Sequence, residues 1–179
     1  MALVQTSGKI INMFTSIQWL NLAASGLVRP RLFKQMVLAA RQGEELPHSV
    51  SAALAPAIDV IRRPMQPSSV LDGWLAWQES PGNRLLCMAE EAYPSLLLEV
   101  EDPPALLFCQ GQFELLASPQ IAMVGTRHPS MAGREDAFRF ASALASSGLT
   151  VTSGLAAGID GASHRGALAA GGRTVAVLG

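Results

Sequence analysis

Short apolar runs alternate with helix-like stretches in the last third of the chain. The runs at 121–124, 149–152 and 174–178 are rich in Val, Ile and Leu, and glycine or serine residues flank them. Between them, apolar residues recur at three- and four-residue intervals, which is the spacing of one helix face. Strands that alternate with helices of this length are typical of a parallel sheet with crossover helices. The pattern therefore predicts a β–α–β–α–β order over residues 121–179.

The first 80 residues show helical spacing only. Apolar positions in 10–24 recur at three and four residues, and Pro30 suits the first turn of a second helix. A third helix is expected over 49–63 and a fourth from about Ser69. The pattern predicts a small helical module over residues 1–80, of SAM-like or helix-hairpin-helix-like type. Such modules can bind DNA, but we favour a plain helical bundle because helical spacing alone says little about ligands.

The segment between these parts is expected to connect them. Residues 81–120 contain two predicted edge strands, at 84–88 and 105–110, with stiff proline-containing turns between them. The fold class is then α/β, a Rossmann-like parallel sheet preceded by a small all-helical module. A doubly wound sheet normally continues beyond its third strand. Residues 121–179 therefore correspond to the first half of a Rossmann-like domain, and we expect an incomplete sheet, truncated after the third core strand.

Composition narrows the class of protein. Hydrophobic residues make up 49% of the chain and charged residues 15%, as in globular domains. The apolar runs are too short to cross a bilayer, and Cys87 and Cys109 are too few for a disulfide framework or a metal cluster. We expect a cytoplasmic protein with reduced thiols, no membrane contact, no metal and no cofactor. Its net charge of −1 conceals an acidic middle segment between two mildly basic ends, so a local basic patch can form.

The loops after the first two core strands suit a phosphate. Backbone N–H groups at a helix start that follows a glycine-containing loop form an anion site. Gly125, Gly154 and Gly158 allow close approach, and the Arg127 guanidinium can bind two phosphate oxygens at once. Hydroxyl donors are expected from Thr126, Ser130 and Ser153, and Ser130 is also the expected N-cap of the helix that begins near residue 131. A dinucleotide fits less well, because neither loop spells the G-x-G-x-x-G fingerprint and no acidic residue ends the second strand.

Asp160 and His164 lie four residues apart, on one face of the second predicted helix. In one interpretation they form an acid/base pair or orient a ligand. In the other, Asp160 caps the helix and His164 makes a local hydrogen bond. The sequence favours neither interpretation.

Taken together, these residues resemble the DNA-processing protein A family (DprA, also called Smf). The resemblance covers about residues 90–179 firmly and the helical module loosely. It rests on motifs that occur in this order: Tyr93-Pro94, Asp102-Pro103-Pro104, Val124-Gly125-Thr126-Arg127 with Pro129-Ser130, Ser153-Gly154-Leu155-Ala156 with Gly158-Ile159-Asp160, and His164.

The resemblance implies a protein that binds single-stranded DNA and has no enzymatic activity. Members of the family protect incoming DNA in natural transformation and load the recombinase RecA onto it. The implied partners are single-stranded DNA, RecA through the missing C-terminal half, and a second copy in a full-length homodimer. Carried over by position, Arg127 contacts a DNA phosphate, and the expected DNA- or phosphate-binding residues are Gly125, Thr126, Arg127, Ser130, Ser153, Gly154, Leu155, Gly158, Ile159, Asp160 and His164.

Two other interpretations remain. The same glycine-rich phosphate loop could serve a nucleotide-processing Rossmann-like hydrolase that uses Asp160 or His164 in catalysis. The chain could also be a truncation product without function, which would aggregate or fail to fold cooperatively.

Overall fold

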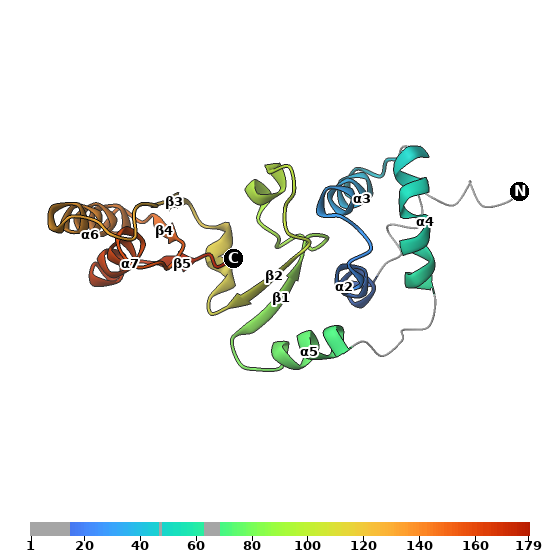
Figure 1. The fold of residues 1–179 in the computed structure, drawn as a ribbon, viewed down its shortest axis with the longest axis horizontal. Coiled ribbons are helices and arrows are strands. Elements are labelled where there is room, and N and C mark those ends of the chain that lie inside the picture. The colour runs from blue at the N-terminus through green and yellow to red at the C-terminus, as the bar shows by residue number, and fades with distance from the viewer. Residues whose placement is uncertain (1–14, 47, 63–68) are drawn as a thin grey trace, which may run out of the picture. The chain divides into compact units, whose positions relative to one another are not determined.

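The computed structural model describes residues 15–46, 48–62 and 69–179, and of residues 58–62 and 69 only the backbone (Figure 1). The chain divides into two compact units, an N-terminal unit of residues 1–113 and a C-terminal unit of residues 114–179. Within the described residues, no helix is long and apolar enough to span a membrane. The three-part division expected from the sequence stays a prediction.

The N-terminal unit begins with helices, as the spacing predicted. Gly26 and Gly43 end the first two, and Pro30 opens the second. Pro56 lies inside the third helix, which nevertheless continues past it. Residues 10–14 of the first predicted helix, and residue 63 of the third, lie outside the described residues. The helices are α2 (Ser16–Ser25), α3 (Pro30–Gln42), α4 (His48–Arg62) and α5 (Ser69–Gln78).

Large apolar side chains fill the core of the N-terminal unit. Trp19 of α2 packs against Phe33 of α3 with their ring centroids 5.1 Å apart. Trp74 and Trp77 are only half-buried, and both meet the exposed ring of Phe108 edge-on. Besides Phe33, the largest fully buried side chains of this unit come from all four helices, from the first strand and from the residue after it: Leu22, Met36, Leu54, Leu71, Leu86, Met88 and Val37.

A two-stranded antiparallel sheet completes this unit. Strand β1 (Asn83–Cys87) pairs with β2 (Leu106–Gln110), with Leu85 opposite Phe108. A 3₁₀ helix, η2 (Ser95–Glu99), lies in the connection between them. The buried Tyr93 hydroxyl donates to the Pro104 carbonyl oxygen (2.7 Å). The tyrosine and proline motifs of this connection therefore hold the loop together.

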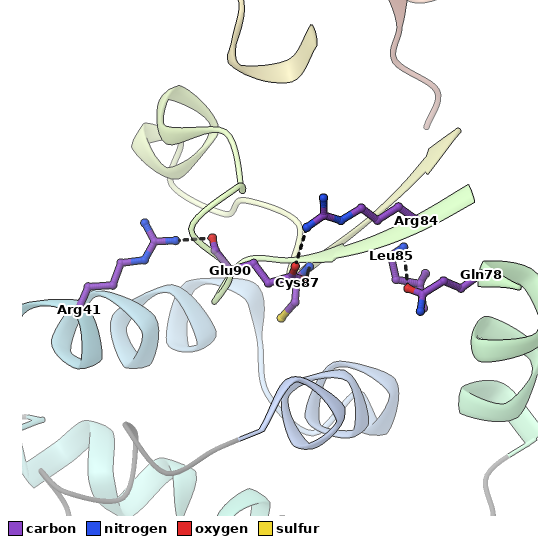
Figure 2. A network of polar contacts seen from close by, with 6 residues as sticks. All are labelled: Arg41, Gln78, Arg84, Leu85, Cys87 and Glu90. Carbon is purple, nitrogen blue, oxygen red and sulfur yellow. Dashed lines mark hydrogen bonds and ion pairs between the residues drawn. The ribbon is translucent and has the colours of Figure 1, made fainter. Parts of the chain in front are cut away.

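Polar side chains fasten α3 and α5 to the sheet (Figure 2). Glu90 accepts hydrogen bonds from the Cys87 backbone N–H (2.8 Å) and from Arg84 Nη2 (3.1 Å). Its carbonyl oxygen accepts from Arg41 Nη2 of α3 (2.8 Å). Gln78 of α5 accepts from the Leu85 backbone N–H (3.0 Å).

Two more cationic side chains of α3 also contact the connection between β1 and β2. Lys34 donates to the Val100 carbonyl oxygen (2.9 Å), and Arg31 pairs with Glu101 (2.9 Å). Three cations of α3, Arg31, Lys34 and Arg41, thus contact residues 88–101. These contacts hold the connection between β1 and β2 against α3.

The C-terminal unit has the predicted β–α–β–α–β order, which gives a Rossmann-like parallel sheet with strand order β3-β4-β5. Ile121 pairs with Val151, and Val151 with Thr174. A 3₁₀ helix, η3 (Phe113–Ala117), precedes the first strand. Ser130 caps α6 as expected, since its Oγ accepts from the Gly133 N–H (3.1 Å). The elements are β3 (Gln120–Ala122), α6 (Met131–Ser146), β4 (Thr150–Ser153), α7 (Ile159–Ala169) and β5 (Thr174–Ala176).

Small residues form the core of this unit. Val151 of β4 packs against Ala141 and Ala145 of α6 and against Ala167 of α7, so both helices cover the same face of the sheet. The helices lie side by side in Figure 1. A Cβ placed on Gly166 of α7 would overlap the Phe138 carbonyl oxygen of α6. The two backbones therefore approach as closely as a glycine allows.

Candidate functional site

The predicted phosphate loops meet at one edge of the parallel sheet. Because parallel strands end at the same edge, the loop after β3 (residues 123–130) and the loop after β4 (residues 154–158) lie together. Helices α6 and α7 begin directly after these loops, so the N–H groups of both first turns point toward this edge.

The backbones of the two loops contact each other at Thr126, Gly158 and Ile159, and we call this contact the joint. The Ile159 N–H donates to the Thr126 carbonyl oxygen (3.2 Å). Gly158 precedes it with φ 90° and ψ −126°, a conformation that side chains disfavour. A Cβ on Gly158 would overlap the Thr126 carbonyl oxygen and lie 2.7 Å from the Arg127 carbonyl oxygen. Only glycine lets the two loops approach this closely.

Gly125 makes a second close contact between the loop after β3 and the start of α7, and it belongs to the same joint. A Cβ at this position would lie 2.6–2.8 Å from three side-chain carbons of Ile159. The backbone of the first loop therefore rests directly on the first residue of α7. Residues Gly125, Thr126, Gly158 and Ile159, predicted from the sequence as site residues, are brought together by this packing.

Arg127 follows the joint and is exposed. Its side chain has no ion pair or hydrogen bond with any described residue, so the guanidinium is free to bind an anion. The neighbouring hydroxyls are partly used. Thr126 Oγ1 accepts from the His128 N–H (3.1 Å), and Ser130 Oγ accepts from the Gly133 N–H (3.1 Å). Each hydroxyl keeps its own hydrogen for donation to a ligand.

Ser153 lies deeper than the sequence suggested. It is 3% exposed, and its hydroxyl donates to the Met123 carbonyl oxygen (2.6 Å). The hydroxyl hydrogen expected to reach a phosphate is thus used between β3 and β4. Ser153 supports the edge from within the sheet, and the hydroxyl hydrogens of Thr126 and Ser130 are the ones that remain available for donation at this edge.

The second loop has an unusual backbone. Leu155 has φ 57°, the one positive φ of a non-glycine residue among those the structure describes. Such a conformation costs about 1–2 kcal/mol, and strained residues of this kind cluster at functional sites. The Leu155 side chain is 55% exposed. A Cβ on the preceding Gly154 would lie 3.0 Å from the buried Asp160 carboxylate, so the loop closes over that group.

Asp160 lies beneath the loop after β4, and His164 lies one turn farther along α7, bonded to the first residue of β5; they are 8% and 6% exposed. The Thr174 hydroxyl donates its single hydrogen to the Val151 carbonyl oxygen (2.7 Å), so His164 Nδ1 must donate to Thr174 Oγ1 (2.7 Å). His164 Nε2 is then the acceptor of the ring, and it is buried with no hydrogen-bond partner in the described chain. Burial lowers the pKa of His164, and the Asp160 charge partly opposes this shift.

These positions bear on both interpretations of the pair. The His164–Thr174 hydrogen bond is the local, structural bond of the second interpretation. Asp160, however, lies in the first turn of α7, and that helix has no side-chain cap hydrogen bond. Its negative charge lies near the helix N-terminus, where it interacts favourably with the helix dipole.

A shallow depression of about 500 Å³ lies in the N-terminal unit. Arg84, Glu90, Glu91 and Ala92 line it. Arg84 already pairs with Glu90 (3.1 Å) and lies 5.3 Å from the Phe113 ring centroid. With its cation engaged and two carboxylates present, this depression does not suit a phosphate. No cluster of three or more metal-ligating side chains occurs in the described part of the chain either.

Sequence comparison places these features in a family. The sequence profile of "DNA recombination-mediator protein A" matches residues 84–179. Protein Smf of Escherichia coli (strain K12) is 42% identical over 113 residues, which cover 63% of this chain and 30% of that protein. DNA processing protein DprA of Bacillus subtilis (strain 168) is 36% identical over 105 residues, which cover 58% of this chain and 35% of that protein.

Structural comparison agrees. The X-ray structure of DNA processing protein A (DprA) from Streptococcus pneumoniae matches with a TM-score of 0.65 and 29% identity, over 92% of this chain and 58% of that one. The present chain therefore spans about a third of the two curated relatives described above and somewhat more than half of the solved structure. By the match over more than half of its length, the chain belongs to the DNA recombination-mediator protein A family, also called DprA or Smf.

Proposed function

We propose that this chain binds the phosphate backbone of single-stranded DNA at the edge where β3 and β4 end. Arg127 contacts a phosphate, the hydroxyls of Thr126 and Ser130 donate to its oxygens, and the first turns of α6 and α7 add backbone N–H groups. Membership of a DNA recombination-mediator family supports DNA as the ligand. The protein acts by binding and not as an enzyme.

One observation carries this proposal. The joint at Gly158 and Ile159 holds two loops together, and the exposed Arg127 beside them has no partner in the described chain. An unpaired arginine next to two helix N-termini attracts a phosphate strongly, because charge and N–H donors act on the same ligand. Phosphate contacts of this kind carry no sequence information, so binding should not depend on base sequence.

We propose further roles for the whole protein. They are protection of incoming single-stranded DNA in the cytoplasm, loading of the RecA recombinase onto it, and action as a homodimer. The residues described above supply the strand-binding edge for these roles. RecA contacts and dimer contacts are proposed for the second half of the Rossmann-like domain.

The nucleotide hydrolase is a weaker candidate. A general acid or base must reach the reacting atoms within hydrogen-bond distance. Asp160 and His164 are both more than nine-tenths buried, and His164 Nδ1 is engaged with Thr174 at the start of β5. Incubation with nucleoside monophosphates should therefore release neither base nor phosphate.

Fluorescence anisotropy with labelled oligo-dT across a salt series tests the proposal. Each phosphate contact contributes about 0.7 to the slope of log affinity against log salt for a single strand. Arg127→Ala should lower the slope by roughly that amount and weaken binding about fivefold at 0.1 M salt. The matched control is Arg173→Ala, since Arg173 lies at the opposite edge of the same sheet, bonded to the Gly148 carbonyl oxygen (2.9 Å).

Two results would overturn the proposal. One is a folded wild-type chain, by circular dichroism, that does not bind oligo-dT at low salt. The other is an equal loss of affinity in Arg127→Ala and Arg173→Ala, because binding would then reflect overall charge and not this edge.

A further inference from the structure

A second arginine points back to the same edge. Arg165 lies on α7, four residues after Gly161, so the two share one face of the helix. A Cβ placed on Gly161 would lie 3.4 Å from Arg165 Nη1 and 3.3 Å from the Ala156 carbonyl oxygen. The guanidinium therefore folds back over the first turn of α7 and lies beside the loop after β4.

Arg165 is exposed and unpaired. Its side chain has no ion pair or hydrogen bond to any residue that the structure describes. Three other arginines are engaged, Arg84 with Glu90, Arg31 with Glu101 and Arg173 with the Gly148 carbonyl oxygen. Arg127, Arg134 and Arg139 of the same unit, like Arg165, have no ion pair or side-chain hydrogen bond to a described residue. Asp160, the acidic residue nearest in sequence, is buried and makes no ion pair with Arg165. The charge of Arg165 is thus available to a ligand at this edge.

Gly161 lies against the guanidinium with no side chain between them. A Cβ there would be slightly closer to the Ala156 carbonyl oxygen than most Cβ contacts are, and it would lie at ordinary contact distance from Arg165 Nη1. The arginine therefore lies along the first turn of its own helix, next to the loop after β4.

We propose that Arg165 is a second phosphate-binding residue, which holds a further phosphate of the strand whose neighbouring part contacts Arg127. The two arginines flank the first turn of α7, one from the loop after β3 and one from the helix itself. The strand then runs across the start of α7 from the first loop toward the exposed face of the helix. This inference rests on the proposed single-stranded DNA binding. It adds Arg165 as a contact and gives the direction in which the bound strand runs.

The experiment compares Arg165→Ala with Arg139→Ala in the oligo-dT salt series. Arg139 is also an exposed arginine of this unit and has no described partner, but it lies about 12 Å along α6 from its first residue. Arg165→Ala should lower the salt slope by roughly 0.7 and weaken binding about fivefold at 0.1 M salt. Arg139→Ala should leave both quantities at their wild-type values.

Two further variants separate charge from geometry. Arg165→Lys keeps the charge and should keep the slope. Its affinity should lie between those of wild type and Arg165→Ala, because lysine cannot make the bidentate phosphate contact. Gly161→Ala also keeps the charge, and its methyl group would contact the guanidinium without overlapping it, so the slope should stay at its wild-type value. In Arg127→Ala/Arg165→Ala the two slope changes should add.

The possible outcomes distinguish this inference from the proposed function. If wild type binds and Arg127→Ala weakens binding, but Arg165→Ala behaves like Arg139→Ala, Arg165 is not a contact and the proposed function stands. If folded wild type does not bind oligo-dT at all, both proposals fail. Circular dichroism of every variant establishes that each comparison is made between folded proteins.

Discussion

In the N-terminal unit large side chains fill the core, whereas the C-terminal unit is closed around alanine and glycine. Phe33, Leu54 and Met36 are fully buried in the first. In the second, Val151 meets Ala141 and Ala167, and the backbones of α6 and α7 touch at a glycine. Large side chains can repack around a change, but a glycine contact between backbones cannot. The two units should therefore respond differently to substitution.

The polar contacts of the two units also differ, because side chains make them in the first unit and the backbone makes them in the second. Long side chains such as Arg41, Glu90 and Gln78 reach across the N-terminal unit to backbone groups (Figure 2). At the edge of the C-terminal unit where we propose phosphate binding, the two loops are joined by the backbone itself, through Thr126 and Ile159. Side chains at that edge, such as Arg127, are consequently left free for a ligand.

The largest effect is expected where a side chain is added to the joint. Gly158→Ala introduces a Cβ that overlaps one backbone carbonyl oxygen, at a φ of 90°. We expect it to destabilise the C-terminal unit by about 3 kcal/mol and to abolish oligo-dT binding. Urea unfolding followed by far-UV circular dichroism measures the loss.

Gly171→Ala is the control for backbone strain alone. Its φ is 67°, but no atom lies within 4 Å of the added Cβ, so it should cost only about 1 kcal/mol. Equal losses in the two variants would show that the close approach at Gly158 does not matter. All three tryptophans, Trp19, Trp74 and Trp77, belong to the N-terminal unit, so the fluorescence transition should keep its midpoint in both variants.

A smaller effect is expected from the polar network of the N-terminal unit. Glu90→Ala removes the acceptor of the Cys87 N–H and the partner of Arg84, and should cost about 2 kcal/mol. Glu90→Gln keeps an acceptor oxygen and should cost about half as much. Tryptophan fluorescence during urea unfolding measures both. If the glutamine variant is as unstable as the alanine variant, the Cys87 hydrogen bond is not what holds the strand end.

The smallest effect is a pH dependence of the C-terminal unit. Burial lowers the pKa of His164 in the folded state. In the unfolded state this pKa is about 6.5. As the pH falls through 6.5 the unfolded chain takes up a proton that the folded chain does not, so stability decreases until the lower folded pKa is reached. Above pH 6.5 this group should contribute no slope.

Urea unfolding at pH 7.5 and 5.5, followed by circular dichroism, detects this dependence. His164→Gln should reduce the difference in unfolding free energy between the two pH values, whereas His128→Gln, at an exposed histidine, should leave it unchanged. A difference that is the same in both variants would mean that His164 is not the responsible group.

Local pattern was sufficient for much of the fold. Apolar spacing predicted the helices and strands of both units, and the strands were confirmed to within two residues at each end. Ser130 was recognised as a cap because capping depends on residues close in sequence. The two 3₁₀ helices were missed, since they are short and have no periodic pattern.

Contacts between distant residues could not be predicted in this way. The inward hydrogen bond of Ser153 to Met123 and the His164–Thr174 bond depend on how strands and helices pack. The same holds for the Gly125–Ile159 contact and for the position of Arg165. Glycine residues in both loops did signal close approach, but their partners became evident only in three dimensions.

Nuclear magnetic resonance titration tests the central claim, that the phosphate backbone binds where β3 and β4 end. Oligo-dT is added to the ¹⁵N-labelled chain of 18.9 kDa, and amide shifts are followed. The account predicts the largest shifts in residues 125–130 and 154–161, with little change near Arg173 and in the N-terminal unit. Shifts concentrated in α3, in residues 84–92 or at the opposite edge of the sheet would contradict it.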